Sequence, residues 1–335
     1  MGASTDPVRL TEWTSCGGCA AKWGASLLGE MVGALPVGFD SSLLVGLAPF
    51  DDAAVYSLTD ELALVSTVDF FPPLVDDPDD FGAIAAANAC SDVFAMGGRV
   101  VLAVNVAAFP EELPREVIAA ILAAASRTVA EAGGIVAGGH TIRNPEPIFG
   151  LAVQGVVDPR RVLRKSGARV GDAAVLSKSL GTGVVTAGGT ATEVRAAIAG
   201  MRTLNRSAAE HLIALGDAVR AATDVTGYGL AGHGWEMADR SGVHLHIDGS
   251  SLPLYTGARE AVERGVRTGG DPRNRAYVEG RFSSLDEVAT ALCMDTPTSG
   301  GLLAAVDQSM VSRLEDSGWT RVGEFTGEAP GVSIG

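Results

Sequence analysis

The sequence predicts a layered α/β protein of two domains. Candidate strands and helices alternate along most of its 335 residues, and 43 glycines with 47% hydrophobic content suit elements joined by short turns. This length is enough for two domains and a substantial core. Turn residues and a basic stretch follow Asp158-Pro159, so we expect an N-terminal α/β domain over 1–158 and a C-terminal α+β domain over 159–335.

The expected elements follow in chain order from the hydrophobic pattern. A mobile, glycine-rich segment opens the chain, and an apolar helix near 27–35 follows it. Residues 62–69 have the pattern of a buried strand that ends in an acid. After these the pattern predicts helices at 81–96, 115–132, 192–201, 206–214 and 257–264, and strands at 100–109, 135–137, 148–157, 172–178, 243–247 and 301–306.

The net charge of −15 argues against nucleic acid as a partner, because nucleic-acid affinity depends on Lys and Arg that neutralise phosphates. Polar residues interrupt every apolar segment before the ~20 residues that a membrane span requires. Residues 1–12 contain no apolar signal-peptide region. We therefore expect a cytoplasmic protein with no membrane contact, and one that needs metal ions to handle anions.

Four segments with aspartates and one with paired glycines together predict a site for Mg²⁺ and polyphosphate. Mg²⁺ is usually held by a few carboxylates together with the phosphates themselves. One such segment alone is more often an ordinary turn, but their number favours a shared site. The segments are Asp51 to Val55, Thr67 to Phe71, Asn88 to Asp92, Gly138 to Thr141, and Asp224 to Gly229.

Two spacings refine this site. Asn88 and Asp92 are four residues apart in a predicted helix, so an amide and a carboxylate share one face. A formal G-x-G-x-x-G occurs at Gly227, Gly229 and Gly232, but residues 220–226 are too polar for the apolar strand that should precede a dinucleotide motif. We expect these glycines to form a tight loop that presents Asp224 and starts a helix. A Walker A sequence is absent.

The cysteines fall into two classes. Cys90 and Cys293 lie among apolar residues and are expected to be small buried hydrophobes. Cys16 and Cys19 form a C-x-x-C that fits a redox pair, half of a zinc site, or a nucleophile with a neighbour. We favour a reactive thiol at Cys19, because Lys22 follows three residues later and would lower a thiolate pKa or bind phosphate.

Two other clusters have simpler interpretations. His244 and His246 alternate on a predicted strand and are potential metal ligands, but no further ligand has recognisable spacing, which favours surface or packing histidines. The acidic run at 76–80 is expected to be a solvated loop and helix cap.

Taken in order, these segments resemble those of the selenophosphate synthetase (selenide, water dikinase) family of the aminoimidazole ribonucleotide synthetase-like superfamily. The resemblance covers nearly the whole chain. Its most specific parts are Cys19-x-x-Lys22, Asp69-Phe70-Phe71 and the run from Pro145 to Val153. It implies a two-domain fold of that superfamily, with N-terminal domains paired into a dimeric β-barrel, and the synthesis of selenophosphate, AMP and orthophosphate from ATP, selenide and water.

The resemblance also implies roles for particular residues. Cys19 and Lys22 would be catalytic, and Asp52, Asp92 and Asp224 would bind Mg²⁺. A selenium-delivery protein is a further implied partner. In that family an arginine commonly precedes the two aspartates, where this chain has Phe50. The residues implied along the nucleotide are Lys22, Pro49, Phe50, Asp51, Asp69, Asn88, Asp92, Gly139, His140 and Thr141.

Two rival functions stay open from the sequence. Another ATPase or kinase of the superfamily, such as thiamine monophosphate kinase, shares the aspartate-rich loops but has no need of Cys19 near Lys22. A non-catalytic selenium or metal carrier would bind through Cys16 and Cys19, but it would not need five nucleotide-site segments.

Overall fold

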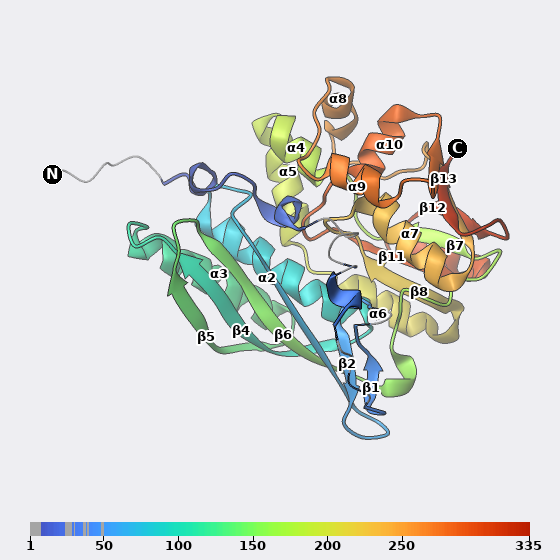
Figure 1. The fold of residues 1–335 in the computed structure, drawn as a ribbon, viewed down its shortest axis with the longest axis horizontal. Helices are drawn as coiled ribbons and strands as arrows, with labels where there is room; N and C mark the ends of the chain where they lie inside the picture. The colour runs from blue at the N-terminus through green and yellow to red at the C-terminus, as the bar shows by residue number, and fades with distance from the viewer. Residues whose placement is uncertain (1–7, 24–28, 30, 36–37, 39, 48–49) are drawn as a thin grey trace.

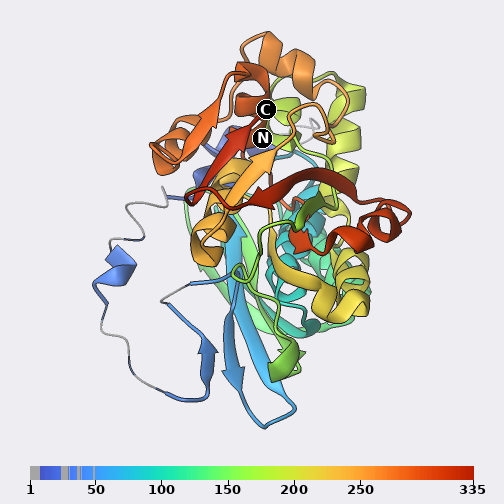
Figure 2. The same cartoon turned by 90° about the vertical axis from the view of Figure 1, so that its right-hand side faces the viewer.

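The computed structural model contains two mixed β-sheets with helices packed between and around them (Figures 1 and 2). It describes residues 8–335 apart from 24–28, 30, 36–37, 39 and 48–49. Pro49 and part of the helix expected near 27–35 therefore lie outside the described residues, although residues 31–33 are helical. In the described part of the chain, no helix is long and apolar enough to cross a membrane.

The N-terminal sheet has the strand order β1-β2-β3-β6-β4-β5, and only β4 and β5 pair in parallel. Helices α2 and α3 pack on one face of it. Its elements are β1 (Leu43–Val45), β2 (Ala54–Ser57), β3 (Ala63–Phe71), α2 (Pro78–Ala95), β4 (Arg99–Phe109), α3 (Arg115–Glu131), β5 (Ile135–Arg143) and β6 (Ile148–Val157).

The predicted elements from residue 62 to 157 are confirmed, with one difference in length. Strand β5 continues six residues beyond its predicted end, through Gly138 and Gly139. These glycines have φ values of 151° and 156°, a region that residues with a side chain rarely adopt. Glycine at both positions therefore allows the backbone conformation that the strand has here. A Cβ at Gly139 would also lie 2.5 Å from the Asn105 carbonyl oxygen.

Helix α2 lies between the N-terminal sheet and the C-terminal domain (Figure 1). Asp77 caps its first turn by accepting hydrogen bonds from the backbone N–H groups of Asp79 and Asp80, as the acidic run predicted. Residues 81–95 are all buried, so the helix is packed on every side. Asn88, Ser91 and Asp92 are the polar residues of this buried and otherwise apolar stretch, and such groups require partners.

The C-terminal sheet has the order β10-β13-β9-β12-β7-β11-β8. Its strands are β7 (Ala173–Leu176), β8 (Val219–Asp224), β9 (His244–Ile247), β10 (Phe282–Ser284), β11 (Leu302–Val306), β12 (Thr320–Thr326) and β13 (Gly331–Ile334). Its helices are α4 (Thr182–Gly188), α5 (Ala191–Arg202), α6 (Arg206–Leu215), α7 (Gly229–Ser241), α8 (Ala258–Glu263), α9 (Asp271–Tyr277), α10 (Glu287–Met294) and α11 (Val311–Glu315).

One prediction for this domain is wrong. Residues 219–224 form strand β8, although the polar sequence predicts no strand before the glycines. Edge strand β8 pairs with β11, and α2 and α7 pack against it, which buries Thr223 and Asp224. The polar side chains of Thr223 and Asp224 are buried among other polar groups and do not face solvent. The hydrophobic pattern of the sequence therefore does not identify this strand. Strands β10, β12 and β13 and helices α4, α9, α10 and α11 were not predicted.

We expect Gly82→Ala to lower the free energy of unfolding by about 1–3 kcal/mol, the usual cost of overpacking a core. A Cβ at Gly82 of α2 would lie 2.2 Å from the Ile121 carbonyl oxygen of α3. This oxygen belongs to the backbone of a helix, so it cannot move away as a flexible side chain could. Urea denaturation measures the change. Gly33→Ala is the control, because no atom of the described residues lies within 4 Å of its added Cβ. Equal stability of Gly82→Ala and the wild type would contradict this packing.

Candidate active site

A pocket of about 360 Å³ lies where the N-terminal strands, the end of α2 and the β8–α7 loop meet. Seven of the residues predicted from the sequence line it, although they come from distant parts of the chain. They are Lys22, Phe50, Asp51, Asp52, Asp69, Asp92 and Asp224.

The three expected metal ligands come from separate elements. Asp52 precedes β2, Asp92 lies on α2, and Asp224 is the last residue of β8. Thr223 donates a hydrogen bond of 2.9 Å to Oδ1 of Asp52. The Oδ2 atoms of Asp52 and Asp224 are buried and have no hydrogen-bond partner among the described residues. Buried oxygens without partners are costly, so this site lacks a donor or a cation.

The electrostatics of these carboxylates fit a divalent cation. Burial raises the pKa of all three, and the pKa of Asp92 is raised further by its carboxylate neighbours Asp69, Asp224 and Asp52. A bound cation would relieve both effects. No three Asp, Glu, His or Cys side chains in the described chain are already arranged as metal ligands, so we expect phosphate oxygens to complete the coordination.

Lys165 is a site residue that the sequence interpretation missed. Its buried Nζ lies 2.9 Å from Oδ1 of Asp52 and 2.8 Å from Oε2 of Glu236 on α7. Burial acts to lower the pKa of Lys165, but the two carboxylates outweigh it and raise this pKa. Its backbone N–H also donates to Asp51. From the sequence, the basic run at 160–169 indicates only a domain boundary. Residue spacing along the chain cannot show that the side chain of Lys165 is buried between Asp52 and Glu236.

The Cys19 thiol is held next to this pocket by a chain of polar contacts. Its Sγ lies 3.6 Å from Oδ1 of Asn88, whose Nδ2 donates a 2.6 Å hydrogen bond to Asp69. Asp69 in turn lies 3.2 Å from Nζ of Lys22. The Cys19 N–H donates to Oγ1 of Thr298. The structure therefore brings together Cys19, Lys22, Asn88 and Asp69 as the sequence predicted.

The protonation of Cys19 differs from the sequence-based expectation. Burial raises its pKa to about 11, and the nearby Lys22 only partly opposes this effect. Lys22 was expected to give a thiolate, but its charge is already paired with Asp69, and Cys19 is 1% exposed. The thiol is therefore protonated at neutral pH in this state.

The neighbouring loop 298–301 also contributes to the thiol site and was not singled out for it from the sequence. The Ser299 N–H donates to Oδ1 of Asn88, the atom that faces Cys19. Ser299 has a φ of 51°, the only positive φ among the described residues other than glycine. Such backbone strain is typical of functional loops. Gly227 packs against Cys19 from the other side, where a Cβ would lie 3.0 Å from the Cys19 carbonyl oxygen.

The remaining cysteines are free thiols. Cys90 and Cys293 are buried, as predicted, and burial raises the pKa of each to about 12. Cys16 is half-buried and lines a separate cavity of about 340 Å³ with Thr14, Thr268 and Thr298. Cys16 and Cys19 therefore face different surroundings although they are three residues apart.

Four predicted nucleotide residues among those the structure describes do not line the pocket. Asn88 lies beside it, between Cys19 and Asp69. Gly139, His140 and Thr141 are exposed on β5, at the far edge of the N-terminal sheet. His244 and His246 do lie on one face of β9, but both contact Oγ of Ser333, at 2.9 and 3.0 Å. Their packing interpretation therefore fits the structure.

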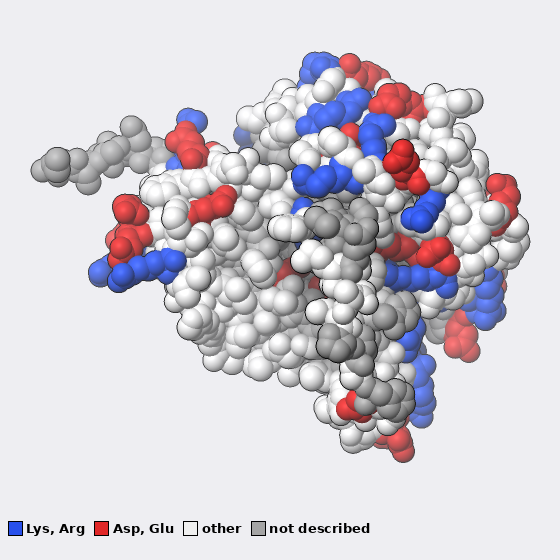
Figure 3. Space-filling model, viewed as in Figure 1, with Lys and Arg blue, Asp and Glu red and all other residues white. Residues whose placement is uncertain are grey.

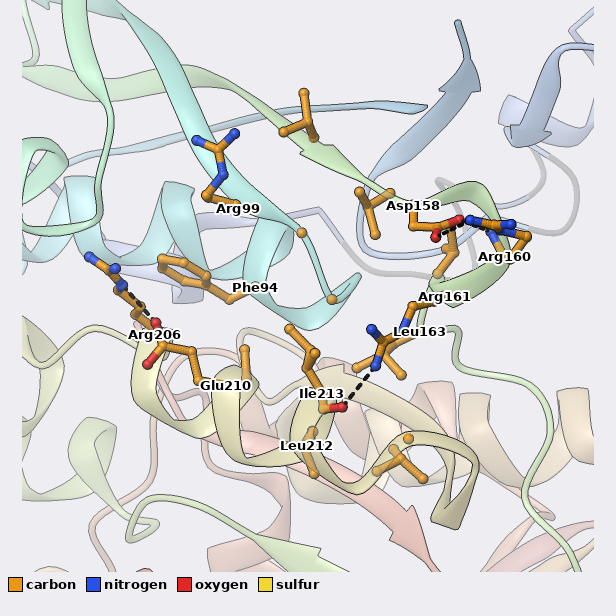
Figure 4. Close-up of a pocket in the computed structure, with 18 of the residues that line it drawn as sticks. Phe94, Arg99, Asp158, Arg160, Arg161, Leu163, Arg206, Glu210, Leu212 and Ile213 are labelled. Atoms are coloured by element: carbon orange, nitrogen blue, oxygen red, sulfur yellow. Dashed lines mark hydrogen bonds and ion pairs between the residues drawn. The ribbon is translucent and has the colours of Figure 1, made fainter. Parts of the chain in front are cut away.

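A larger cavity of about 450 Å³ lies at the junction of the two domains, and no predicted site residue lines it. Figure 4 shows Phe94 at the end of α2 facing α6, and Arg161 extending from the linker to the carbonyl of Ile213, 3.2 Å away. The predicted site residues that line a cavity therefore line the smaller pocket and not this one.

Comparisons with known proteins match both domains. The model of the AIR synthase related protein N-terminal domain matches residues 50–157, and that of the C-terminal domain matches residues 169–328. The selenide, water dikinase of Myxococcus xanthus is 44% identical over 98% of both chains. The selenide, water dikinase of Caldanaerobacter subterraneus is 43% identical over 92% of this chain and 91% of its own.

The fold is also similar to that of solved structures, among them the thiamine-monophosphate kinase from Stenotrophomonas maltophilia, with a TM-score of 0.64 at 22% identity, over 94% of this chain and 96% of that one. AaThiL complexed with AMPPCP and TMP matches with a TM-score of 0.68 at 20% identity, over 92% of this chain and 91% of that one. At this identity the similarity shows a common fold and no more.

Proposed function

Because the chain belongs to the AIR synthase related family, and within it to the selenide, water dikinases, we propose that this pocket makes selenophosphate from selenide, ATP and water. The observation that carries the proposal is the convergence of Lys22, Asp52, Asp92 and Asp224 on one pocket beside a buried thiol. AMP and orthophosphate are the other products. A simple kinase of the same fold would not need Cys19 beside Lys22.

Each of these residues has a role that follows from its chemistry. Phosphoryl transfer depends mainly on positioning and on neutralising charge. Asp52, Asp92 and Asp224 would hold Mg²⁺, which would neutralise phosphate charge when bound. Lys22 would exchange its contact with Asp69 for a phosphate oxygen. Cys19 would present its sulfur to the selenium substrate, with Asn88 and Ser299 as its supports.

We also propose a homodimer that pairs through the outward face of the N-terminal sheet. Figure 3 shows a broad uncharged region over β6, β4 and β5. Large exposed apolar patches often mark interfaces. We assign the nucleotide contact expected of residues 139–141 to the pocket of a neighbouring subunit. The apolar side chains of β3, β4 and β5 that are between 38% and 64% exposed are Val68, Phe70, Val101, Ile135 and Ile142.

The reaction itself is tested by anaerobic incubation with ATP, Mg²⁺ and selenide, followed by ³¹P NMR. We expect AMP, orthophosphate and a selenophosphate signal, each dependent on selenide. ADP as the only nucleotide product, with another small molecule phosphorylated, would instead support the kinase alternative. Selenide binding without ATP turnover would support the carrier alternative.

A further inference from the structure

Arg240 is a cation near the pocket that forms no ion pair among the residues that the structure describes. Lys22 is paired with Asp69, and Lys165 is paired with Asp52 and Glu236. Arg240, the penultimate residue of α7, makes no ion pair with Asp or Glu in the described part of the chain, and its Nη1 is buried there without a hydrogen-bond partner. A buried donor without an acceptor is unfavourable, which points to an absent acceptor.

The position of the Arg240 guanidinium is fixed by Phe50. Its Cζ lies 4.2 Å from the centre of the Phe50 ring, within the range of a cation–π contact. Phe50 itself lines the pocket, next to Asp51. Burial is the largest influence on the pKa of Asp51 and raises it, while Arg240 is close enough for its charge to act in the opposite direction. The guanidinium is therefore near the pocket wall, in contact with the Phe50 ring.

We propose that Arg240 binds a phosphate oxygen of ATP, with the Phe50 ring as the platform that orients it. A guanidinium presents N–H donors in a planar fork that matches phosphate oxygens, and no carboxylate of the described residues forms an ion pair with it. The proposal deepens the proposed function, because it rests on a nucleotide in this pocket. It does not depend on selenium chemistry.

The test is the affinity for AMPPCP, a non-hydrolysable ATP analogue, measured with Mg²⁺ by calorimetry. Arg240→Ala should weaken binding about 10- to 100-fold, the range expected for a charge-assisted hydrogen bond. Arg240→Lys should fall between that variant and the wild type, because it keeps the charge and loses the fork. Phe50→Leu should weaken binding only about 2- to 5-fold, since it removes the platform alone. Arg313→Ala, an exposed helical arginine, is the control and should bind as the wild type does.

Adenosine separates phosphate binding from a structural role of the stacked arginine. Its binding, followed by saturation-transfer NMR, should be the same in Arg240→Ala and in the wild type. Wild-type affinity of Arg240→Ala for AMPPCP would overturn the proposal, and so would an equal loss for adenosine and AMPPCP. If AMPPCP binding depends on Arg240 but no selenophosphate forms, the inference stands and the proposed reaction fails.

Discussion

Asp224→Asn is expected to lower selenide-dependent ATP turnover at least ~100-fold, a loss typical of removing one preorganised electrostatic contact. Asp224 is 2% exposed, and its free Oδ2 is available to a cation. The fold should persist, because Asp52 and Asp224 repel each other in the metal-free protein and the substitution removes that repulsion. The midpoint of thermal unfolding should therefore stay the same or rise.

The measurement is steady-state turnover over a Mg²⁺ titration, with circular dichroism to verify the fold. Asp217→Asn, an exposed aspartate outside the pocket, is the matched control and should behave as the wild type does. Near-normal activity of Asp224→Asn would show that Asp224 is not a ligand of the proposed metal site. It would also reopen the dinucleotide interpretation of Gly227, Gly229 and Gly232, since a strand does precede them.

Cys19→Ser is expected to lose at least ~100-fold of selenide-dependent turnover, while Cys16→Ser has a mild effect. Cys19 contacts Asn88 and adjoins the pocket through Asp69, whereas Cys16 lines another cavity. Serine keeps the backbone contact to Thr298 and nearly the same volume, so the loss would come from the sulfur. Product analysis by ³¹P NMR measures it. A Cys19→Ser enzyme with the wild-type rate would contradict the catalytic role of Cys19.

The same two thiols should differ in reactivity without substrates. Because the pKa of Cys19 is about 11 and its side chain is buried, iodoacetamide at neutral pH should alkylate Cys16 first. Labelling of Cys19 should increase as the pH rises towards that pKa. Peptide mass spectrometry resolves the order, and preferential labelling of Cys19 at neutral pH would contradict the burial argument.

Local signals in the sequence predicted much of the fold and the site. The cap at Asp77, the helix that places Asn88 and Asp92 on one face, and the convergence of dispersed aspartates all depend on residue type and short spacing. A polar strand such as β8 has no such signal, because its polar side chains are buried by contacts with distant elements.

Lys165 and Arg240 illustrate the same limit within the site. Each acts through a partner far away in the chain, Asp52 and Phe50 respectively, so spacing alone cannot find it. The pKa of Cys19 was misjudged for a related reason, since the sequence shows the adjacent lysine but neither its pairing with Asp69 nor the burial of the thiol.

The bridge from Lys165 to Asp52 and Glu236 has a practical consequence for handling the enzyme. This lysine supplies positive charge to the carboxylates even without a divalent ion, so we expect the protein to stay folded without metal. Purification in chelating buffer should therefore yield a folded but inactive protein. Returning Mg²⁺ should restore catalysis without a refolding step.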